Sequence, residues 1–443
     1  MTSGNPFDRR RPSPRRTQVN VYRVSDLDEF DLRELSDHEN LAFAFRYMRA
    51  YGGHGGGADG ATYGDFDGAR IYQLCRALRD QVRGGEYRPG PRRRVRFPKQ
   101  NGNGFRELSI PTVADRVVSG ALQLATEIWQ RNNFDCIHRS IWTCYLELEH
   151  AVQTTDARLL VTDDIRNCFP SIRINELLNC IARYTSNPEL LGLYELLIRG
   201  TEAPDRQAGV FQGSPESPGL VGMYLHDILD AVQDVLCREI PSRIRYADNL
   251  IHVFRNEYEA DEDRSTTSDI LSQHGLQLKG QERTDIRNNT DVEVLGLIPR
   301  LEGTRIRYQI PTGKYEQLEE RFESCWDQRN PMKAARAVTR GWINHAAPVL
   351  VEQQAQRAVI SQVLRCASRK SLSLGPRTRW EAEARRTLKA WRRFRRRHGE
   401  GSLVGSIGNC SNVVSCRDTP DAGEMPATSA VADDNIAPWE PHS

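Results

Sequence analysis

The chain has 443 residues, enough to bury a large core and to form several subdomains. Hydrophobic residues make up 38% of it, and its apolar runs fall short of the ~18 residues that a membrane span needs, which argues against an integral membrane protein. The N-terminus lacks the apolar segment of a secretory signal, and the 10 cysteines are scattered without a Cys-x-x-Cys pair. These features predict a cytoplasmic protein with reduced thiols and no membrane partner.

Charge is unevenly distributed along the chain. The net charge is only +2, but residues 401–443 hold one arginine and six acidic residues, so the 400 residues before them carry a net charge of +7. Clustered basic charge favours a polyanionic partner such as nucleic acid. The first 20 residues contain five arginines among Pro and Ser. We interpret 1–35 as a flexible basic arm and 401–443 as a disordered acidic tail.

A glycine-rich loop and a basic ribbon stand out in the first quarter of the chain. The loop, 52–60, separates two predicted helices and lacks the helix with Lys-Ser/Thr of a Walker motif. From 88 to 112, arginines alternate with apolar residues around the turn 102–104, a pattern typical of a two-stranded ribbon. Such a ribbon can hold phosphates through guanidinium groups, or can be a solvated edge. Its candidate phosphate contacts are Arg92, Arg93, Arg94, Lys99 and Arg106.

Carboxylates and a glutamine–glycine turn mark the centre of the chain. A buried-type strand, 159–164, ends in Asp163 and Asp164, and alternation along a strand places these two side chains on opposite faces. Gln212 and Gly213 precede a predicted helix, where amides can meet a planar or anionic ligand. Apolar spacing predicts helices over 36–49, 69–82, 115–129, 175–184, 188–199, 220–237, 259–274, 315–326, 332–342 and 348–369.

A hairpin is predicted over 242–254, with Asp248 at its tip in the turn Tyr246-Ala-Asp-Asn249. A carboxylate held by rigid strands suits a metal ligand, although Asp-Asn is also ordinary turn chemistry. A further strand is predicted at 292–298. Residues 357–397 hold 14 lysines and arginines, among them Arg392 and Arg393, and two glutamates. Basic helices of this kind fit the backbone of a nucleic-acid duplex.

The order of these motifs resembles that of a bacterial reverse transcriptase of the group II intron-like type. The segments similar to its motifs A to E are 164–172, 212–218, 246–249, 275–278 and 295–297. The resemblance implies an α+β, right-hand polymerase fold. Its parts would be the fingers with an N-terminal extension at 36–158, an antiparallel-sheet palm at 159–308 and an all-helical, basic thumb at 309–400.

The resemblance also assigns roles to residues. Asp164 and Asp248, with the backbone carbonyl of Ile165, would hold two Mg²⁺ ions, for which Mn²⁺ can substitute. Asp163 is then expected to be structural. The other assignments place Lys99 and Arg106 on the triphosphate, Gln212 and Gly213 at the nucleotide pocket, and Phe169 beneath the sugar, where it would exclude ribonucleotides.

Two positions depart from the family pattern. Asn249 replaces the second acid of motif C, and Arg283 stands where motif D usually has a lysine that donates a proton. Three hypotheses remain open: an RNA-directed DNA polymerase copying a dedicated RNA into DNA from dNTPs, template-independent or protein-primed synthesis at the same site, and a maturase-like RNA-binding protein without activity. No endonuclease module is recognised after the thumb, so we expect a domesticated enzyme of antiphage defence.

Overall fold

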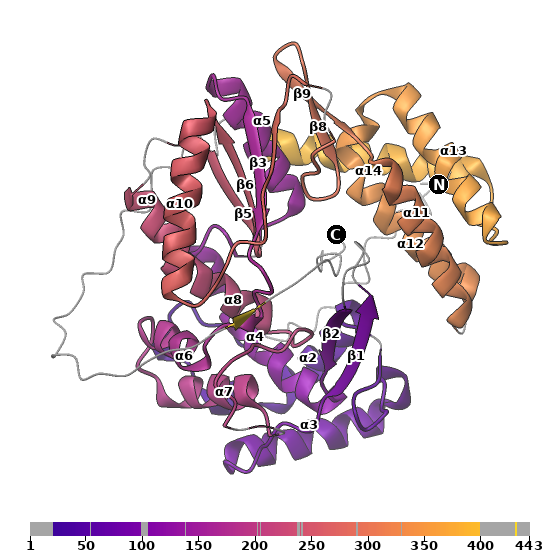
Figure 1. Ribbon diagram of the computed structural model, residues 1–443. Helices are drawn as coiled ribbons and strands as arrows, with labels where there is room; N and C mark the ends of the chain where they lie inside the picture. The colour runs from indigo at the N-terminus through magenta and orange to yellow at the C-terminus, as the bar shows by residue number, and fades with distance from the viewer. Residues whose placement is uncertain are drawn as a thin grey trace, which may run out of the picture.

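The computed structural model describes residues 21–398 and 430–431, apart from positions 54, 99–104, 138, 202, 204, 237–239, 241, 289–290 and 329. The described chain belongs to the α+β class, as predicted, because antiparallel strands and helices both contribute to its cores. Its elements form three groups, for which we keep the names fingers, palm and thumb (Figure 1).

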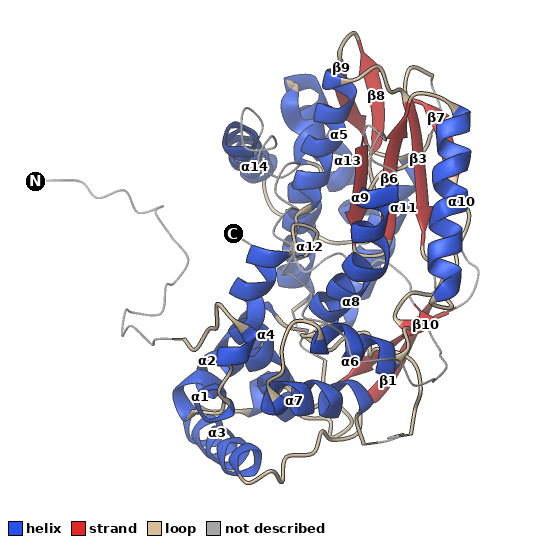
Figure 2. Cartoon of the chain, turned by 90° about the vertical axis from the view of Figure 1, so that its left-hand side faces the viewer, coloured by secondary structure: helices blue, strands red, loops and turns tan. Residues whose placement is uncertain are grey.

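The palm is an antiparallel sheet between two helices. Its strands, in the spatial order β5-β6-β3-β7, are β5 (Ser242–Tyr246), β6 (Asn249–Phe254), β3 (Leu159–Asp164) and β7 (Glu282–Asp285). Helix α10 (Glu257–Gln273) covers one face and α5 (Ile141–Thr154) the other (Figures 1 and 2). Because strand side chains alternate, Leu159 and Val161 pack towards α10, whereas Leu160 joins the core with α5.

The fingers share one large core with the helices that precede and follow the Gln212-Gly213 turn. Helix α4 (Val113–Asn133) forms the centre of this core, and its N-cap is the Thr112 hydroxyl, which accepts a hydrogen bond from the Asp115 amide. The basic ribbon is β1 (Arg93–Pro98) paired with β2 (Phe105–Ile110), as predicted. The other elements here are η1 (Leu27–Glu29), α1 (Leu32–Leu35), α2 (His38–Tyr51), η2 (Tyr63–Asp65), α3 (Gly68–Arg83), α6 (Ile174–Ala182), α7 (Pro188–Arg199) and α8 (Ser217–Leu225).

The segment 21–35, which we expected in the basic arm, packs on the fingers. Val24, Leu27, Phe30 and Leu35 are buried, and the Val24 amide donates to the carbonyl of Ala125 on α4 (2.9 Å). Residues 1–20 lie outside the described residues. So does the acidic tail, apart from the short strand β10 (Ala430–Val431), which pairs with β4 (Pro170–Ser171).

The thumb is helical and docks on the palm. Its own core joins α11 (Thr312–Glu323), η4 (Ser324–Asp327), α12 (Pro331–His345), η5 (Ala347–Val351), α13 (Gln353–Arg369) and α14 (Arg377–His398). A hairpin of β8 (Ile298–Glu302) and β9 (Arg305–Gln309) precedes it (Figure 1). Trp391 of α14 packs edge to face on Trp142 of α5, 5.5 Å between ring centroids, so that the last helix returns to the palm.

Two predicted elements differ most from the structure, and the helix predicted at 348–369 is also divided, into η5 and α13, at the extended residue Glu352. The segment 292–298 is not a strand: Leu295 and Gly296 take positive φ values of 47° and 90°, and the amides of Val294 and Leu297 donate to each other's carbonyls in a tight turn. The helix at 220–237 is divided into α8, a π-helical turn η3 (His226–Asp230) and α9 (Ala231–Leu236). Neither an apolar run nor its period distinguishes a buried turn from a strand, or a π-turn from an α-helix.

Candidate active site

The palm sheet brings Asp164 and Asp248 to the same end of neighbouring strands. Asp164 ends β3, directly opposite Asn249 at the start of β6, and Asp248 occupies the β5–β6 turn just before it. The amide of Ile165 donates to the carbonyl of Asp248 (3.2 Å), which links the two segments. Asp248 is only 7% exposed and the Asp164 side chain 16%. Two carboxylates, partly shielded from water, therefore share one corner of the palm.

Lys279 is a site residue that the sequence pattern did not single out. Its amide donates to the carbonyl of Asp164 (2.8 Å), and its ammonium group forms an ion pair with Asp164 Oδ2. Lys279 directly follows the 275–278 segment, so its position next to that motif could have identified it from the sequence. The lysine balances the charge of Asp164 from the neighbouring chain segment.

Asp163 lies on the other face of β3, as strand alternation predicts. Its Oδ1 accepts hydrogen bonds from the amides of Asp164 (2.8 Å) and Gly280 (3.0 Å), and its Oδ2 lies 3.6 Å from Arg264 Nε on α10. These contacts fix the backbone around Asp164 and Lys279, which is a structural role.

The two departures from the family pattern lie in different surroundings. Asn249 is half-buried at the corner, where its Nδ2 donates to the carbonyl of Tyr246 (3.4 Å) across the turn. Arg283 pairs in register with Val161, three residues before Asp164, and its guanidinium binds Glu257 and Asp261 on α10. Arg283 is thus directed to the α10 face, whereas Lys279 is the cation at the carboxylates.

The Gln212-Gly213 turn rests against the basic ribbon. The Ser109 amide of β2 donates to the carbonyl of Gln212 (2.8 Å), and Gly213 adopts a positive φ of 106°. A Cβ atom on Gly213 would lie 2.8 Å from the Ser109 carbonyl oxygen, so only glycine fits here. Half-buried Phe169 joins the same unit, because its carbonyl accepts from the amide of Val210 (2.7 Å).

The arginines expected to contact nucleic acid differ in exposure. Arg92 is only 6% exposed; its guanidinium donates to the Ser214 hydroxyl and the Leu197 carbonyl and lies over the Phe211 ring at 3.9 Å. A phosphate cannot reach it, so Arg92 instead joins the ribbon to the Gln212-Gly213 turn. Arg93 is exposed and donates to the Gly56 carbonyl (2.7 Å).

The remaining expected contacts lie in the ribbon and the thumb. Arg94 is exposed and lies 3.5 Å from Glu107 on the neighbouring strand. Arg392 and Arg393 are exposed on α14. Lys99 and the side chain of Arg106 lie outside the described residues.

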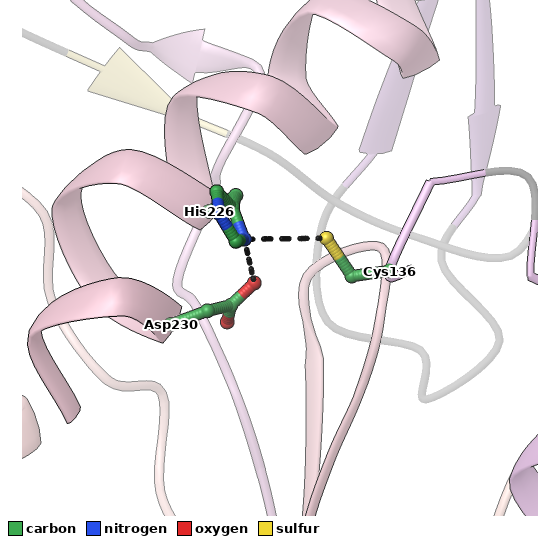
Figure 3. A group of neighbouring side chains, drawn as sticks. All are labelled: Cys136, His226 and Asp230. Carbon is green, nitrogen blue, oxygen red and sulfur yellow. Dashed lines mark hydrogen bonds and ion pairs between the residues drawn. The ribbon is translucent and has the colours of Figure 1, made fainter. Parts of the chain in front are cut away.

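Cys136, His226 and Asp230 form a second group of potential metal ligands (Figure 3). His226 Nδ1 is 3.9 Å from Cys136 Sγ and 3.7 Å from Asp230 Oδ2. Arg245 donates both to Cys136 Sγ (3.1 Å) and to Asp230. Burial opposes charge on His226, but its contacts with Asp230 and Cys136 prevail and raise its pKa to about 10. Arg245, a permanent cation, already donates to two of these three side chains, which disfavours a metal cation there.

Comparison with known proteins identifies this region. Residues 97–298, which include the corner of Asp164 and Asp248, match the family model described as reverse transcriptase (RNA-dependent DNA polymerase). The chain contains a reverse transcriptase domain. It is 29% identical over 212 residues to Protein YkfC of Escherichia coli (strain K12) and 28% identical over 213 residues to the group II intron-encoded protein LtrA of Lactococcus lactis subsp. cremoris. These similarities confirm the expected resemblance to group II intron-like reverse transcriptases.

The matched region is a part of each relative. Both alignments cover 45% of this chain, and they cover 54% of YkfC and 35% of LtrA. The chain therefore spans about half or less of the length of these relatives. Apo telomerase from Candida tropicalis is similar over 77% of this chain and 74% of its own, with a TM-score of 0.39 and 10% identity. This score is too low to show a shared fold.

The described residues were also searched for membrane spans. Neither in the reverse transcriptase domain nor in the other described segments does any helix have the length and apolar character needed to cross a bilayer.

Proposed function

We propose that this protein is an RNA-directed DNA polymerase that adds dNTPs to a primer 3′-hydroxyl by two-metal-ion catalysis. The observation that carries the proposal is the meeting of Asp164 and Asp248 at adjacent strand ends within the reverse transcriptase domain. Two carboxylates on a rigid sheet are the ligand set that nucleotidyl transfer requires.

The donor set at the corner fits Mg²⁺. Carboxylate and carbonyl oxygens are hard ligands, and Mg²⁺ takes one or two carboxylates and completes its shell with water and substrate phosphates. Asp164, Asp248 and the Ile165 carbonyl would hold two ions, with Mn²⁺ as a substitute. When bound, such ions activate the primer hydroxyl and neutralise charge on the triphosphate. Lys279 would have to yield Asp164 Oδ2 to a metal, since its ammonium group forms an ion pair with that oxygen.

The nucleotide would bind between the palm and the basic ribbon. Gln212 and Gly213 form the wall that touches β2, and Phe169 lies in the same unit. Lys99 and Arg106, from the ribbon, would hold the triphosphate. A phenyl ring beneath the sugar would exclude a 2′-hydroxyl, so Phe169→Ala should raise ribonucleotide incorporation about tenfold or more relative to dNTPs. Unchanged exclusion would remove Phe169 from this role.

Exposed arginines would bind the template and product. Phosphates can reach the exposed arginines of the ribbon, Arg93 and Arg94, and those of α14, Arg392 and Arg393. They cannot reach Arg92, which is buried. The RNA template, which we take to be a dedicated non-coding RNA, and the DNA product would contact these groups. The cytoplasmic location, expected from the sequence composition, and the antiphage role, expected from the resemblance, stay predictions.

Asn249 favours one alternative, an RNA-binding protein without activity. It replaces a carboxylate at the corner with an amide whose nitrogen is engaged in the turn. Asp164 and Asp248 nevertheless supply both principal ligands, which supports catalysis. Template-independent synthesis would use the same corner without an RNA template, and protein-primed synthesis would use it with a protein hydroxyl as the primer.

The deciding experiment is Mg²⁺-dependent dNTP incorporation on a primed RNA. Wild type and Asp269→Asn, which changes an exposed carboxylate on α10, should incorporate dNTPs equally. Asp248→Ala should reduce incorporation by about a thousandfold or more, because it removes a metal ligand. Equal incorporation by Asp248→Ala would refute the site. Tight RNA binding without incorporation by any variant would favour the binding function, and incorporation without added RNA would favour template-independent synthesis.

A further inference from the structure

Arg245 is a buried guanidinium that contacts four separate parts of the chain. It lies on β5, and its side chain is 4% exposed. Its Nε donates to both oxygens of Asp230 on η3 (2.8 and 3.0 Å). Its Nη2 donates to the carbonyl of Gly222 on α8 (3.2 Å) and to Cys136 Sγ (3.1 Å), and its Nη1 donates to the carbonyl of Ala247 (2.9 Å).

The contact with Ala247 bears directly on Asp248. Ala247 adopts a positive φ of 54°, which is uncommon for a residue other than glycine and persists only where the surroundings enforce it. Its carbonyl belongs to the peptide unit that leads into Asp248. The hydrogen bond from Arg245 therefore fixes the plane of that peptide, and with it the direction in which the carboxylate leaves the turn.

The contact with Gly222 ties the same turn to the nucleotide side of the site. Helix α8 begins at Ser217, a few residues after Gln212 and Gly213, and Gly222 lies in its middle. One planar side chain thus connects the Asp248 turn with the helix that follows the Gln212-Gly213 turn. An arginine suits this task because its donors are held in a rigid fork.

The surrounding groups hold the guanidinium in place. Asp230 neutralises its charge, and although burial opposes ionisation of Asp230, Arg245 and His226 lower the pKa of this carboxyl well below its ordinary value. Figure 3 shows Cys136, His226 and Asp230 converging. Asp230 and Cys136 accept hydrogen bonds from Arg245, and His226 contacts both of them, so this group anchors the arginine.

We infer that Arg245 is a positioning residue, which orients Asp248 through the Ala247 carbonyl and couples it to α8 through the Gly222 carbonyl, with Asp230 as its anchor. The inference rests on the proposed function, because it assigns Asp248 a metal. A purely structural role, in which Arg245 only neutralises a buried carboxylate, is the competing explanation.

A paired substitution separates the two roles. Arg245→Met alone removes the arginine from half-buried Asp230, leaves it only His226 at 3.7 Å, and should lower both the melting temperature and kcat. Adding Asp230→Asn removes that poorly paired charge and should recover most of the melting temperature. If Arg245 positions Asp248, kcat of the double variant stays lower than wild type by about tenfold or more, the effect of a lost charge-assisted hydrogen bond. If kcat recovers together with the melting temperature, the inference is wrong.

A second readout does not depend on incorporation. Mn²⁺ binding, followed by the electron paramagnetic resonance signal of the free ion, should weaken in the double variant towards the level of Asp248→Ala. Arg243→Met, which removes another arginine of β5 that pairs with Asp234 and Asp263, should bind Mn²⁺ like wild type. Wild-type Mn²⁺ affinity in the double variant would overturn the inference. Absence of incorporation in wild type, with the Mn²⁺ differences intact, would instead count against the proposed polymerase.

Discussion

Lys279 shows how a single cation can set the properties of the carboxylate corner. Its ammonium group forms an ion pair with Asp164 Oδ2, one of the two carboxylate oxygens that could bind a metal ion, and its backbone amide donates to the carbonyl of the same residue. The backbone amide of Lys279 therefore positions Asp164, while its ammonium group competes with a metal ion for the carboxylate. Lys279 belongs to the site by contact, whereas Arg283, the position expected from the motif, is engaged by two acids of α10.

Lys279→Met should lower the Mg²⁺ concentration that gives half-maximal incorporation. Without the ammonium group, the charge of Asp164 is left to attract the metal, and we expect a shift of about threefold or more. The measurement is a Mg²⁺ titration of dNTP incorporation at saturating nucleotide. Lys314→Met, which removes a lysine paired with Glu293 on a different segment, is the control and should leave the midpoint unchanged. A midpoint that stays or rises would show that Lys279 does not compete with the metal.

At the scale of residues, the positions of the two carboxylates could be predicted from the sequence, but the side chains that surround them could not. Asp164 and Asp248 follow from strand ends and motif order, both of which are local patterns. The contacts of Arg92 and Arg245 do not. Arg92 directly precedes β1 and Arg245 lies on β5, and only the packing shows that their guanidinium groups are buried against carbonyls, a hydroxyl and a carboxylate. Charge in a sequence does not reveal whether it faces water.

Among the elements, the Gln212-Gly213 turn depends on a close approach to β2. Gly213→Ala should destabilise the protein by about 1–3 kcal/mol and raise the KM for dNTPs, since a Cβ there meets Ser109 and Leu108 at 2.8 and 2.9 Å and the positive φ disfavours alanine. Chemical denaturation and steady-state kinetics would measure the two effects. Gly192→Ala on α7, where a Cβ meets nothing within 4 Å, should change neither KM nor stability adversely. Equal behaviour of the two variants would contradict this account.

Long periodic helices and the two hairpins around 88–112 and 242–254 could be predicted from sequence, because their signals lie within one element. The strand at 292–298 could not be distinguished from a turn, since its left-handed residues include Leu295, which carries no turn signal. Strand β7 also escaped prediction. It is four residues long, and it is a strand because β3 offers it a hydrogen-bonding edge. Tertiary pairing decides such short strands.

At the scale of the whole molecule, the thumb places exposed basic side chains on a helix anchored to the palm. Replacing Arg392 and Arg393 together by glutamine should weaken binding of primed RNA and reduce the slope of log affinity against log salt by roughly one to two units, because two phosphate contacts are lost. Fluorescence anisotropy at several salt concentrations measures both. The matched control changes Arg49 and Arg76, exposed arginines on α2 and α3, and should keep the wild-type slope. An unchanged slope for the α14 variant would remove this helix from the nucleic-acid interface.

The anchor of that helix should respond to pH. Glu149 of α5 pairs with Arg395 of α14 at 2.6 Å and is 5% exposed, and burial raises its pKa from 4.5 to about 7 although Arg395 opposes the shift. The folded state thus holds a proton that the unfolded state releases near pH 4.5. This stability contribution is fully present below pH 4.5 and is lost as the pH rises through about 7.

Glu149→Gln should therefore flatten the pH dependence of stability between pH 4.5 and 7.5. Glutamine keeps the shape of the side chain and an acceptor for Arg395 but cannot release a proton. The free energy of unfolding of the wild type should therefore fall by on the order of 2 kcal/mol more than that of the variant over this range. Melting temperatures measured across the range provide the test. Glu195→Gln, at an exposed pair with Arg199 on α7, should follow the wild-type curve. Parallel curves for wild type and Glu149→Gln would mean that Glu149 is already ionised in the folded protein, with Arg395 outweighing its burial.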